Sequence, residues 1–213
     1  MKSSDSVKNE EKASNSHLNC QKDNTCPIRA FIDADATLWY HDGVHYVLEN
    51  GIMNGMGGGA FAPNSTPARA QMAQILYNME DRPVIRSGIP FDDVTQDAWY
   101  AAAVSWAESK SIMVGNGDGR FGPNDVLTRE QLVTIVYRYA QYKGVDVSVG
   151  EDTNILSYDD ALDVSGWAVS ATQWAVGTGL ITGRTATTLN PTDTATRAEI
   201  ATIIMRYCTQ ITK

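Results

Sequence analysis

Three arginines at matching positions carry the most distinctive chemistry of this 213-residue sequence. Arg69, Arg129 and Arg197 each stand thirty residues after a tryptophan, and successive arginines are 60 and 68 residues apart. A guanidinium group keeps its charge at physiological pH and donates two parallel hydrogen bonds to a carboxylate. Each arginine also falls at the predicted start of a helix, where unpaired backbone N–H groups favour an anion. The three arginines are therefore candidate anion-binding positions.

A structural role is the alternative for the same arginines. Each could instead pair with an acidic residue just before the preceding tryptophan, and the candidate partners are Asp33, Asp93 and Asp160. Such a pair would only hold two parts of one repeat together. The sequence leaves both interpretations open.

Glycine-rich turns precede the first two arginines and form a second candidate contact surface. Their residues are Asn116, Gly117, Asp118 and Gly119 in the second copy, and Gly57 and Gly58 in the first. Such turns tolerate positive φ and expose backbone amides, and Asp118 can accept hydrogen bonds from the hydroxyl groups of a ligand. A plain turn between two helices would explain the same residues. A calcium loop is not predicted, because the ligand series is too short and lacks its final glutamate.

The residues that must position these groups form one unit repeated three times. Besides the tryptophan and the arginine, each copy keeps a glycine, a proline and an aromatic or leucine residue in register. Each unit has the pattern helix, loop, helix, and its second helix has apolar residues at i, i+3, i+4 and i+7. A single unit is too small to bury two helices well. We therefore predict an all-α fold whose three tandem helix-loop-helix repeats form one pseudo-threefold, or pseudo-trimeric, body.

Composition and local signals set the expected boundaries. The repeats are predicted at 30–83, 90–143 and 157–211, after a flexible polar tail or linker at 1–29 that has almost no large apolar residue. Capping boxes predict the start of the second helix in the later copies, at Thr128 with Gln131 and at Thr196 with Glu199. In the first copy, Thr66 before Pro67 is the candidate cap, one turn earlier.

Two sets of tryptophans are expected to lie mainly in the core. Trp39, Trp99 and Trp167 share a helical stripe with later apolar residues, although exposed aromatic rings can also stack on a ligand. Trp106 and Trp174, which follow Trp99 and Trp167 by seven residues, are expected to be buried.

Composition and charge exclude several classes of protein. The formal net charge of −8 argues against a general nucleic-acid binder that neutralises phosphates. No apolar run approaches the roughly 20 residues that span a bilayer, so membrane insertion is not expected. No secretory signal is visible near the first residue.

Neither metal binding nor catalysis is predicted. Cys20 and Cys26 form no metal-binding pattern with a histidine partner, which makes zinc improbable, while a local disulfide between them stays open. Cys208 is expected to be a buried small hydrophobe. His41 and His45 lack the glutamate of a metalloprotease helix. Because no triad motif, phosphate loop or cofactor fingerprint occurs either, we predict a protein that is not an enzyme and needs no cofactor.

The repeated motifs resemble those of the S-layer homology (SLH) family over about residues 31–210. The second copy matches most fully, with FDDV at 91–94 and SIMVGNGDGRFGPNDVLTREQ at 111–131. The third keeps TRAE at 196–199 and GLITG at 179–183 but reads GRTATTLNP in its loop. The first keeps GIMNG at 51–55 and FAPN at 61–64, with ARAQ at 68–71 around its arginine.

The resemblance implies a fold and a function. SLH repeats bind secondary cell-wall polysaccharide, often a pyruvylated one, in grooves between repeats, and so anchor exported proteins to the bacterial wall. It thereby implies an extracellular location in the cell wall or S-layer, an anionic glycan as partner, and an associated or fused exported cargo. The arginines and glycine turns named above would contact the glycan, and the third copy, which lacks the acidic turn, is expected to have a degenerate groove. The alternatives are a structural or protein-interaction scaffold that has lost glycan binding, and the anchor fragment of a larger exported enzyme.

Overall fold

The computed structural model describes residues 16–86 and 88–212, and this part of the chain is helical, with no strand. Its six α-helices are α1 (His41–Glu49), α2 (Arg69–Met79), α3 (Ala101–Ser109), α4 (Arg129–Tyr142), α5 (Val169–Gly177) and α6 (Arg197–Arg206). Short 3-10 turns lie before α1 and between α4 and α5, and a π-helical turn, Tyr207–Ile211, continues α6. The predicted all-α class and the two helices in each repeat are confirmed. No helix among the described residues is both long enough and apolar enough to cross a membrane.

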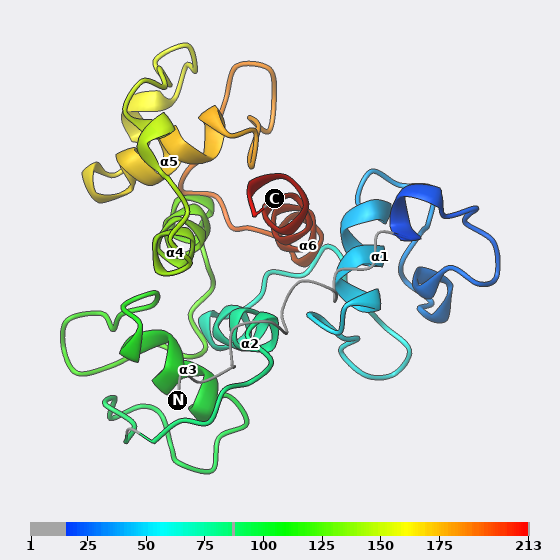
Figure 1. Cartoon of the computed structure of the whole chain (residues 1–213), viewed down its shortest axis with the longest axis horizontal. Helices are drawn as coiled ribbons and strands as arrows, with labels where there is room; N and C mark the ends of the chain where they lie inside the picture. The colour runs from blue at the N-terminus through cyan, green and yellow to red at the C-terminus, as the bar shows by residue number, and fades with distance from the viewer. Residues whose placement is uncertain (1–15, 87, 213) are drawn as a thin grey trace, which may run out of the picture.

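The second helices of the three repeats, α2, α4 and α6, lie around the centre of a three-lobed body, and α1, α3 and α5 lie outside them (Figure 1). Each outer helix packs against the inner helix of the preceding repeat: α3 against α2, α5 against α4, and α1 against α6. Each lobe therefore combines helices from two repeats. The last of these contacts joins the third repeat to the first and closes the ring.

The tryptophans separate into a buried and an exposed set. Trp106 and Trp174 are 1 % and 0 % exposed, as predicted. Trp39, Trp99 and Trp167 are 65 %, 64 % and 56 % exposed, so the expectation that they lie in the core is wrong. Each stands two residues before its helix begins, in a turn where the helical spacing used for the prediction does not apply.

The outer helix of the first repeat depends on close packing. Gly43 lies inside α1, where glycine lowers helix propensity. A Cβ atom on Gly43 would lie 2.7 Å from the backbone of Thr202 in α6. Glycine is therefore required by the approach of α1 to α6, and that contact outweighs its poor propensity.

The predicted capping boxes form in the two later repeats. The amide of Gln131 donates to the Thr128 hydroxyl at 3.3 Å, and the Thr196 amide donates to the Glu199 carboxylate at 2.7 Å. The first repeat forms half of this box: the Ala68 amide donates to Gln71 Oε1 at 2.9 Å. The candidate cap at Thr66 is wrong, because α2 begins at Arg69.

The predicted tail differs from the structure over the part that can be described. Residues 16–30 include two 3-10 turns, Ser16–Asn19 and Pro27–Ala30, which pack against α1. Ile28 is fully buried there, and His17 and Cys26 are 3 % exposed. Residues 1–15 of the predicted tail lie outside the described residues.

Candidate functional site

Each of the three arginines reaches across to the next repeat in the ring. All three are buried, with 4–8 % of each residue exposed. The Nε atom donates to a loop carbonyl at 2.9 Å in every case, and the acceptors are Phe121 for Arg69, Leu189 for Arg129 and Phe61 for Arg197. Nη2 reaches a second carbonyl in the same loop, that of Val114, Thr182 and Asn54 respectively. The arginines therefore join neighbouring repeats.

The backbone at the start of each inner helix is also occupied. The amides of Arg69, Arg129 and Arg197 donate at 2.9 Å to carbonyls of the adjoining repeat. The next amide along each helix does the same with a proline carbonyl. The predicted anion site at these helix starts is therefore wrong for the first two amides, because each already has a protein acceptor.

The acidic residues before the tryptophans have a different role from the one considered. The two carboxylate oxygens of Asp160 accept the amides of Leu189 and Asn190 at 2.8 and 2.7 Å. Asp33 and Asp93 hold the equivalent loop segments in the same way. Burial alone would raise the pKa of Asp93 and of Asp160, but the backbone amides outweigh it and lower both. These carboxylates fasten the loops of their own repeats and form no ion pair with the three arginines.

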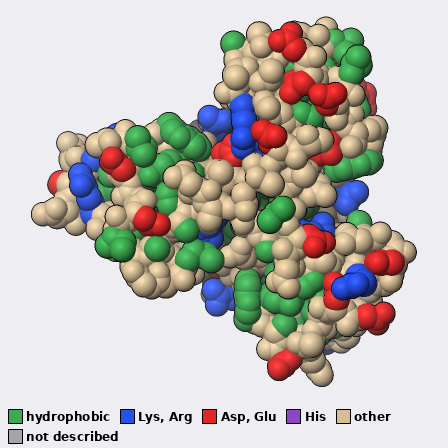
Figure 2. All heavy atoms as spheres, turned by 180° about the vertical axis from the view of Figure 1, so that it is seen from behind, with side chains coloured by type: hydrophobic (Ala, Val, Ile, Leu, Met, Phe, Trp, Pro, Cys, Tyr) green, Lys and Arg blue, Asp and Glu red, His purple; other side chains and the backbone are tan. Residues whose placement is uncertain are grey.

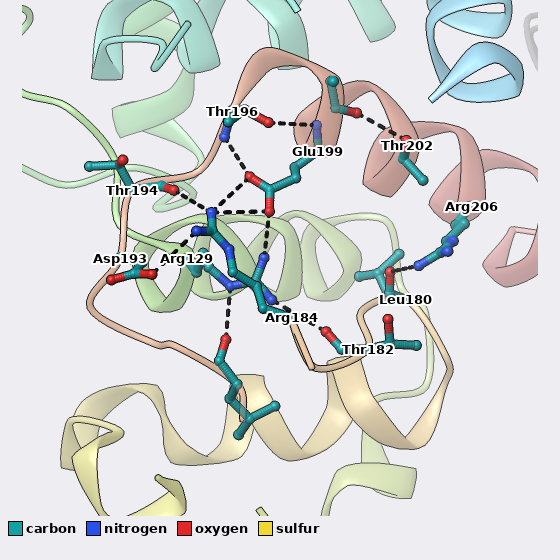
Figure 3. A network of polar contacts seen from close by, with 12 residues as sticks. Arg129, Leu180, Thr182, Arg184, Asp193, Thr194, Thr196, Glu199, Thr202 and Arg206 are labelled. Atoms are coloured by element: carbon teal, nitrogen blue, oxygen red, sulfur yellow. Dashed lines mark hydrogen bonds and ion pairs between the residues drawn. The ribbon is translucent and has the colours of Figure 1, made fainter. Parts of the chain in front are cut away.

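One groove brings side chains from all three repeats together. Its volume is about 370 Å³, and Trp39 of the first repeat and Arg129 of the second contribute to its wall. The third repeat supplies the remaining polar residues, which are Thr182, Arg184, Glu199, Thr202 and Arg206 (Figure 3). The groove therefore contains three guanidinium groups, one carboxylate, two hydroxyl groups and an exposed indole.

Positive side chains outnumber negative ones in this groove, and some of them form ion pairs. Glu199 accepts from Arg129 Nη1 at 2.9 Å and from Arg184 Nη2 at 3.2 Å. Arg184 also pairs with Asp193 at 3.2 Å, outside the groove wall. Arg206 donates to the Leu180 carbonyl at 3.2 Å and has no ion pair among the described residues. Burial lowers the pKa of Arg129, and the negative charge of Glu199 opposes this shift. Because guanidinium groups stay protonated in proteins, Arg129 keeps its charge.

The other two arginines have different neighbours at the same register positions. Where the third repeat has Arg184, the second has Asn116 and the first has Met56. Counterparts of Arg206 and Glu199 are Arg138 and Gln131 in the second repeat, and Asn78 and Gln71 in the first. Gln71 Nε2 contacts Met56 Sδ at 3.5 Å, which reproduces the contact of Glu199 with Arg184. Arg69 and Arg197 also lie 4.7 Å over the rings of Phe121 and Phe61, where Arg129 has Leu189.

The predicted glycine turns form turns outside this groove. Gly117, Gly119, Gly57 and Gly58 all have positive φ, between 60° and 95°. Asp118 accepts the Arg120 amide at 3.1 Å and so closes its own turn. These residues and Asn116 are exposed, and none of them lines the groove at Arg129.

The groove also contains residues that the sequence analysis missed. Arg184 lies in the third-copy loop that was expected to be degenerate, and Arg206 lies at the end of α6. The available signal was register: both occupy positions that are aligned across the repeats but differ in residue type. Basic side chains are visible on the surface where neighbouring lobes meet (Figure 2).

Comparison with known proteins identifies related sequences. The family model for the S-layer homology domain matches residues 30–73, 90–133 and 157–201. The chain is 31 % identical over 167 residues to "Exoglucanase XynX" of Acetivibrio thermocellus, covering 78 % of this chain and 15 % of that protein. It is 30 % identical to the "Surface-layer 125 kDa protein" of Lysinibacillus sphaericus, covering 78 % of this chain and 14 % of that protein. With the "Cellulosome-anchoring protein" of Acetivibrio thermocellus it shares 27 % identity over 73 % of this chain and 35 % of that protein.

The chain thus spans a small part of the length of these relatives, and the similarity lies in the repeats. The relatives differ in name and share this region. Because the family model matches more than half of the sequence, in three tandem positions that each contain one outer helix and the start of one inner helix, the chain belongs to the S-layer homology domain family.

Proposed function

We propose that this chain is a noncatalytic module that holds an exported protein on the bacterial cell wall by binding an anionic secondary cell-wall polysaccharide. The observation that carries the proposal is the groove at Arg129, where three guanidinium groups face one carboxylate beside an exposed tryptophan. A net positive groove on a chain of net charge −8 points to local recognition of an anion.

The lining of the groove suits a sugar that carries a carboxylate. Arg206 has no ion-pair partner among the described residues, and Arg184 is about one-third exposed, so both are available to a carboxylate such as that of a ketal-linked pyruvate. Trp39 offers an apolar face against which a sugar ring can stack. The exposed hydroxyl group of Thr182 can bond a sugar hydroxyl.

The three predicted arginines have unequal parts in this proposal. Arg129 lines the groove and donates to Glu199, which in turn accepts from Arg184. Arg69 and Arg197 join the repeats and contribute to glycan binding only where a carboxylate can reach their remaining Nη1 atoms. The glycine turns at Gly57 and Gly58 and at Asn116 to Gly119 would contact the glycan outside the main groove.

The relatives support attachment as the common role of the repeats. One is named as a surface-layer protein, one as an exoglucanase and one as a cellulosome-anchoring protein. The feature shared by proteins with such different names is the region that this chain matches. We propose that the chain carries a fused or associated cargo in the same manner, at the cell wall or in the S-layer.

The test is co-sedimentation of the purified chain with wall sacculi of the source organism, before and after chemical removal of the secondary polysaccharide. We expect pelleting that disappears with the polymer. Trp39→Ala should weaken binding about tenfold, which corresponds to about 1.4 kcal/mol. Trp99→Ala is the matched control, since Trp99 is equally exposed at the same position of another repeat. Absence of pelleting with both preparations would favour the protein-interaction scaffold instead.

A further inference from the structure

Four potential metal ligands converge beside α1, and none of them lines the groove at Arg129. Cys20 and Cys26 come from the segment before the first repeat, and His41 and His45 lie one turn apart on α1. One ligand atom of each residue lies within 4.8 Å of all the others. Cys26, His41 and His45 are 2–3 % exposed and Cys20 is half-buried, so three of the four ligands are shielded from water.

The distances within the cluster suit a tetrahedral zinc ion. Cys26 Sγ lies 3.4 Å from His41 Nε2 and 3.8 Å from His45 Nδ1. Zinc bonds of about 2.3 Å to sulfur and about 2.1 Å to nitrogen place tetrahedral S and N ligands about 3.6 Å apart. Two thiolates would also balance the charge of the ion, so burial of the whole site would leave no net charge.

The outer hydrogen bonds direct the correct nitrogen of each histidine toward the cluster. His41 Nδ1 lies 2.6 Å from an Asp42 carboxylate oxygen, which can only accept, so the proton is on Nδ1 and the Nε2 lone pair faces Cys26. Ser16 Oγ donates to Glu49 at 2.6 Å and therefore accepts from His45 Nε2 at 3.1 Å. This leaves the Nδ1 lone pair of His45 facing Cys26 as well. Metal-binding histidines typically have such an acceptor behind the ring.

A disulfide accounts less well for these lone pairs. If Cys20 and Cys26 were joined, both cluster-facing nitrogens would be buried acceptors with no thiol proton to receive. A cation satisfies both nitrogens and both sulfurs at once. The Lys22 amide also donates to Cys20 Sγ at 3.3 Å, an interaction that supports a thiolate.

We propose that Cys20, Cys26, His41 and His45 bind one zinc ion, which fixes the segment before the first repeat to α1. The ligand spacing supports this assignment: three residues separate the histidines and fourteen separate Cys26 from His41, as in Cys₂His₂ sites. The five residues between the cysteines exceed the usual two to four. The expectation of no metal rested on the sequence around the cysteines, and the fold brings the histidines to them.

The test measures metal directly in the reduced chain, freed of any histidine tag. We expect one equivalent of zinc per chain by elemental analysis after purification with zinc present. After removal of zinc by a chelator, Co²⁺ should give the intense visible bands of a tetrahedral site with sulfur-to-metal charge transfer, and added zinc should abolish them. The cobalt spectrum of the wild-type chain tests the proposal without any variant.

Variants assign the ligands. Cys26→Ser and His45→Gln should lose the bound zinc and the tetrahedral cobalt spectrum, with helix content followed by circular dichroism. Cys208→Ser is the matched control, because Cys208 lies after α6 and outside the cluster, and it should retain one equivalent. The proposal is overturned if the reduced wild-type chain binds neither metal, if the cobalt spectrum is octahedral, or if Cys26→Ser binds zinc as the wild type does.

Discussion

The three junctions between repeats share one framework and differ in what they present to solvent. In each, an arginine donates to two carbonyls of the next repeat, and an aspartate holds the loop that supplies them. The positions around the arginine vary. At Arg129 they are Arg184, Arg206 and Glu199, whereas at Arg197 the counterparts are Met56, Asn78 and Gln71. At Arg69 they are Asn116, Arg138 and Gln131.

This difference separates assembly from recognition. The arginines shared by all three junctions bond to backbone, and any sequence that keeps the loop can supply those carbonyls. The varied side chains lie at the groove, where they set its charge without altering the framework. We therefore expect substitutions of the shared arginines that bond only to backbone, Arg69 and Arg197, to change stability, and substitutions of the varied residues around Arg129 to change glycan binding.

The largest expected effect is on the framework. Arg197→Ala should lower the free energy of unfolding by about 3 kcal/mol, because the carbonyls of Phe61 and Asn54 lose their donors at a buried junction. Denaturant unfolding followed by circular dichroism measures the change. Arg206→Ala, which removes a partly exposed arginine nine residues further on, is the control and should cost well under half as much. Equal losses would contradict the separation of assembly from recognition.

The next effect concerns recognition. Replacing Arg184 by Met and Arg206 by Asn gives the groove at Arg129 the residues of the first repeat at two positions. We expect wall binding to fall tenfold or more, about 1.4 kcal/mol or above, with the stability changed by less than that. Co-sedimentation isotherms and unfolding curves on the same protein measure both quantities. Unchanged binding would remove the groove from the proposed function.

A smaller effect distinguishes the loops. Ala62 has φ of 58°, and the equivalent residues are Gly122 at 69° and Asn190 at 52°. Alanine is disfavoured in this left-handed region, so Ala62→Gly should stabilise the chain by about 1 kcal/mol. Ala60→Gly, two residues earlier, lacks this strain and should not stabilise. Thermal unfolding of the two variants decides the matter, and a destabilising Ala62→Gly would contradict the equivalence of the loops.

The smallest expected effect comes from removing the one carboxylate of the groove, which is a charge that distinguishes this junction from the other two. Glu199→Gln gives the third repeat the residue that the other two have at this position, and Gln131 shows that the capping box tolerates it. The groove would lose its one carboxylate, so we expect the affinity for the anionic polymer to rise about threefold, or about 0.6 kcal/mol. Salt should weaken the gain, since screening reduces electrostatic attraction. A loss of affinity would mean that Glu199 serves mainly to position Arg184.

Much of the fold could be predicted from the sequence because the signals are local and threefold repeated. The apolar spacing of α4 and the hydroxyl and amide of Thr128 and Gln131 act within one or two helical turns. The exposure of Trp39 could not be predicted in this way. The spacing of Trp39 matches the apolar stripe of α1, but α1 begins only at His41. Trp39 therefore lies in the preceding turn, where helical spacing does not determine which side chains are buried, and its indole is exposed.

The site depended on contacts between repeats, which the sequence does not specify. Arg129 could be recognised as a candidate, whereas its acceptors, Leu189 and Thr182, are more than fifty residues away. The cluster at Cys26 and His41 was missed for the same reason: the intervening segment has little regular structure, and only its folding back onto α1 brings sulfur and imidazole together.

The packing of α1 against α6 has a consequence for how the chain acquires its structure. Linear repeat arrays fold outward from any point, because each unit contacts only its neighbours. Here the first outer helix has its partner in the last repeat, and Arg197 reaches back 136 residues to Phe61. A contact of this range is slow to form, because the long intervening chain must be closed first. The first repeat therefore stays incomplete during synthesis until α6 has emerged, and the whole ring forms late and cooperatively.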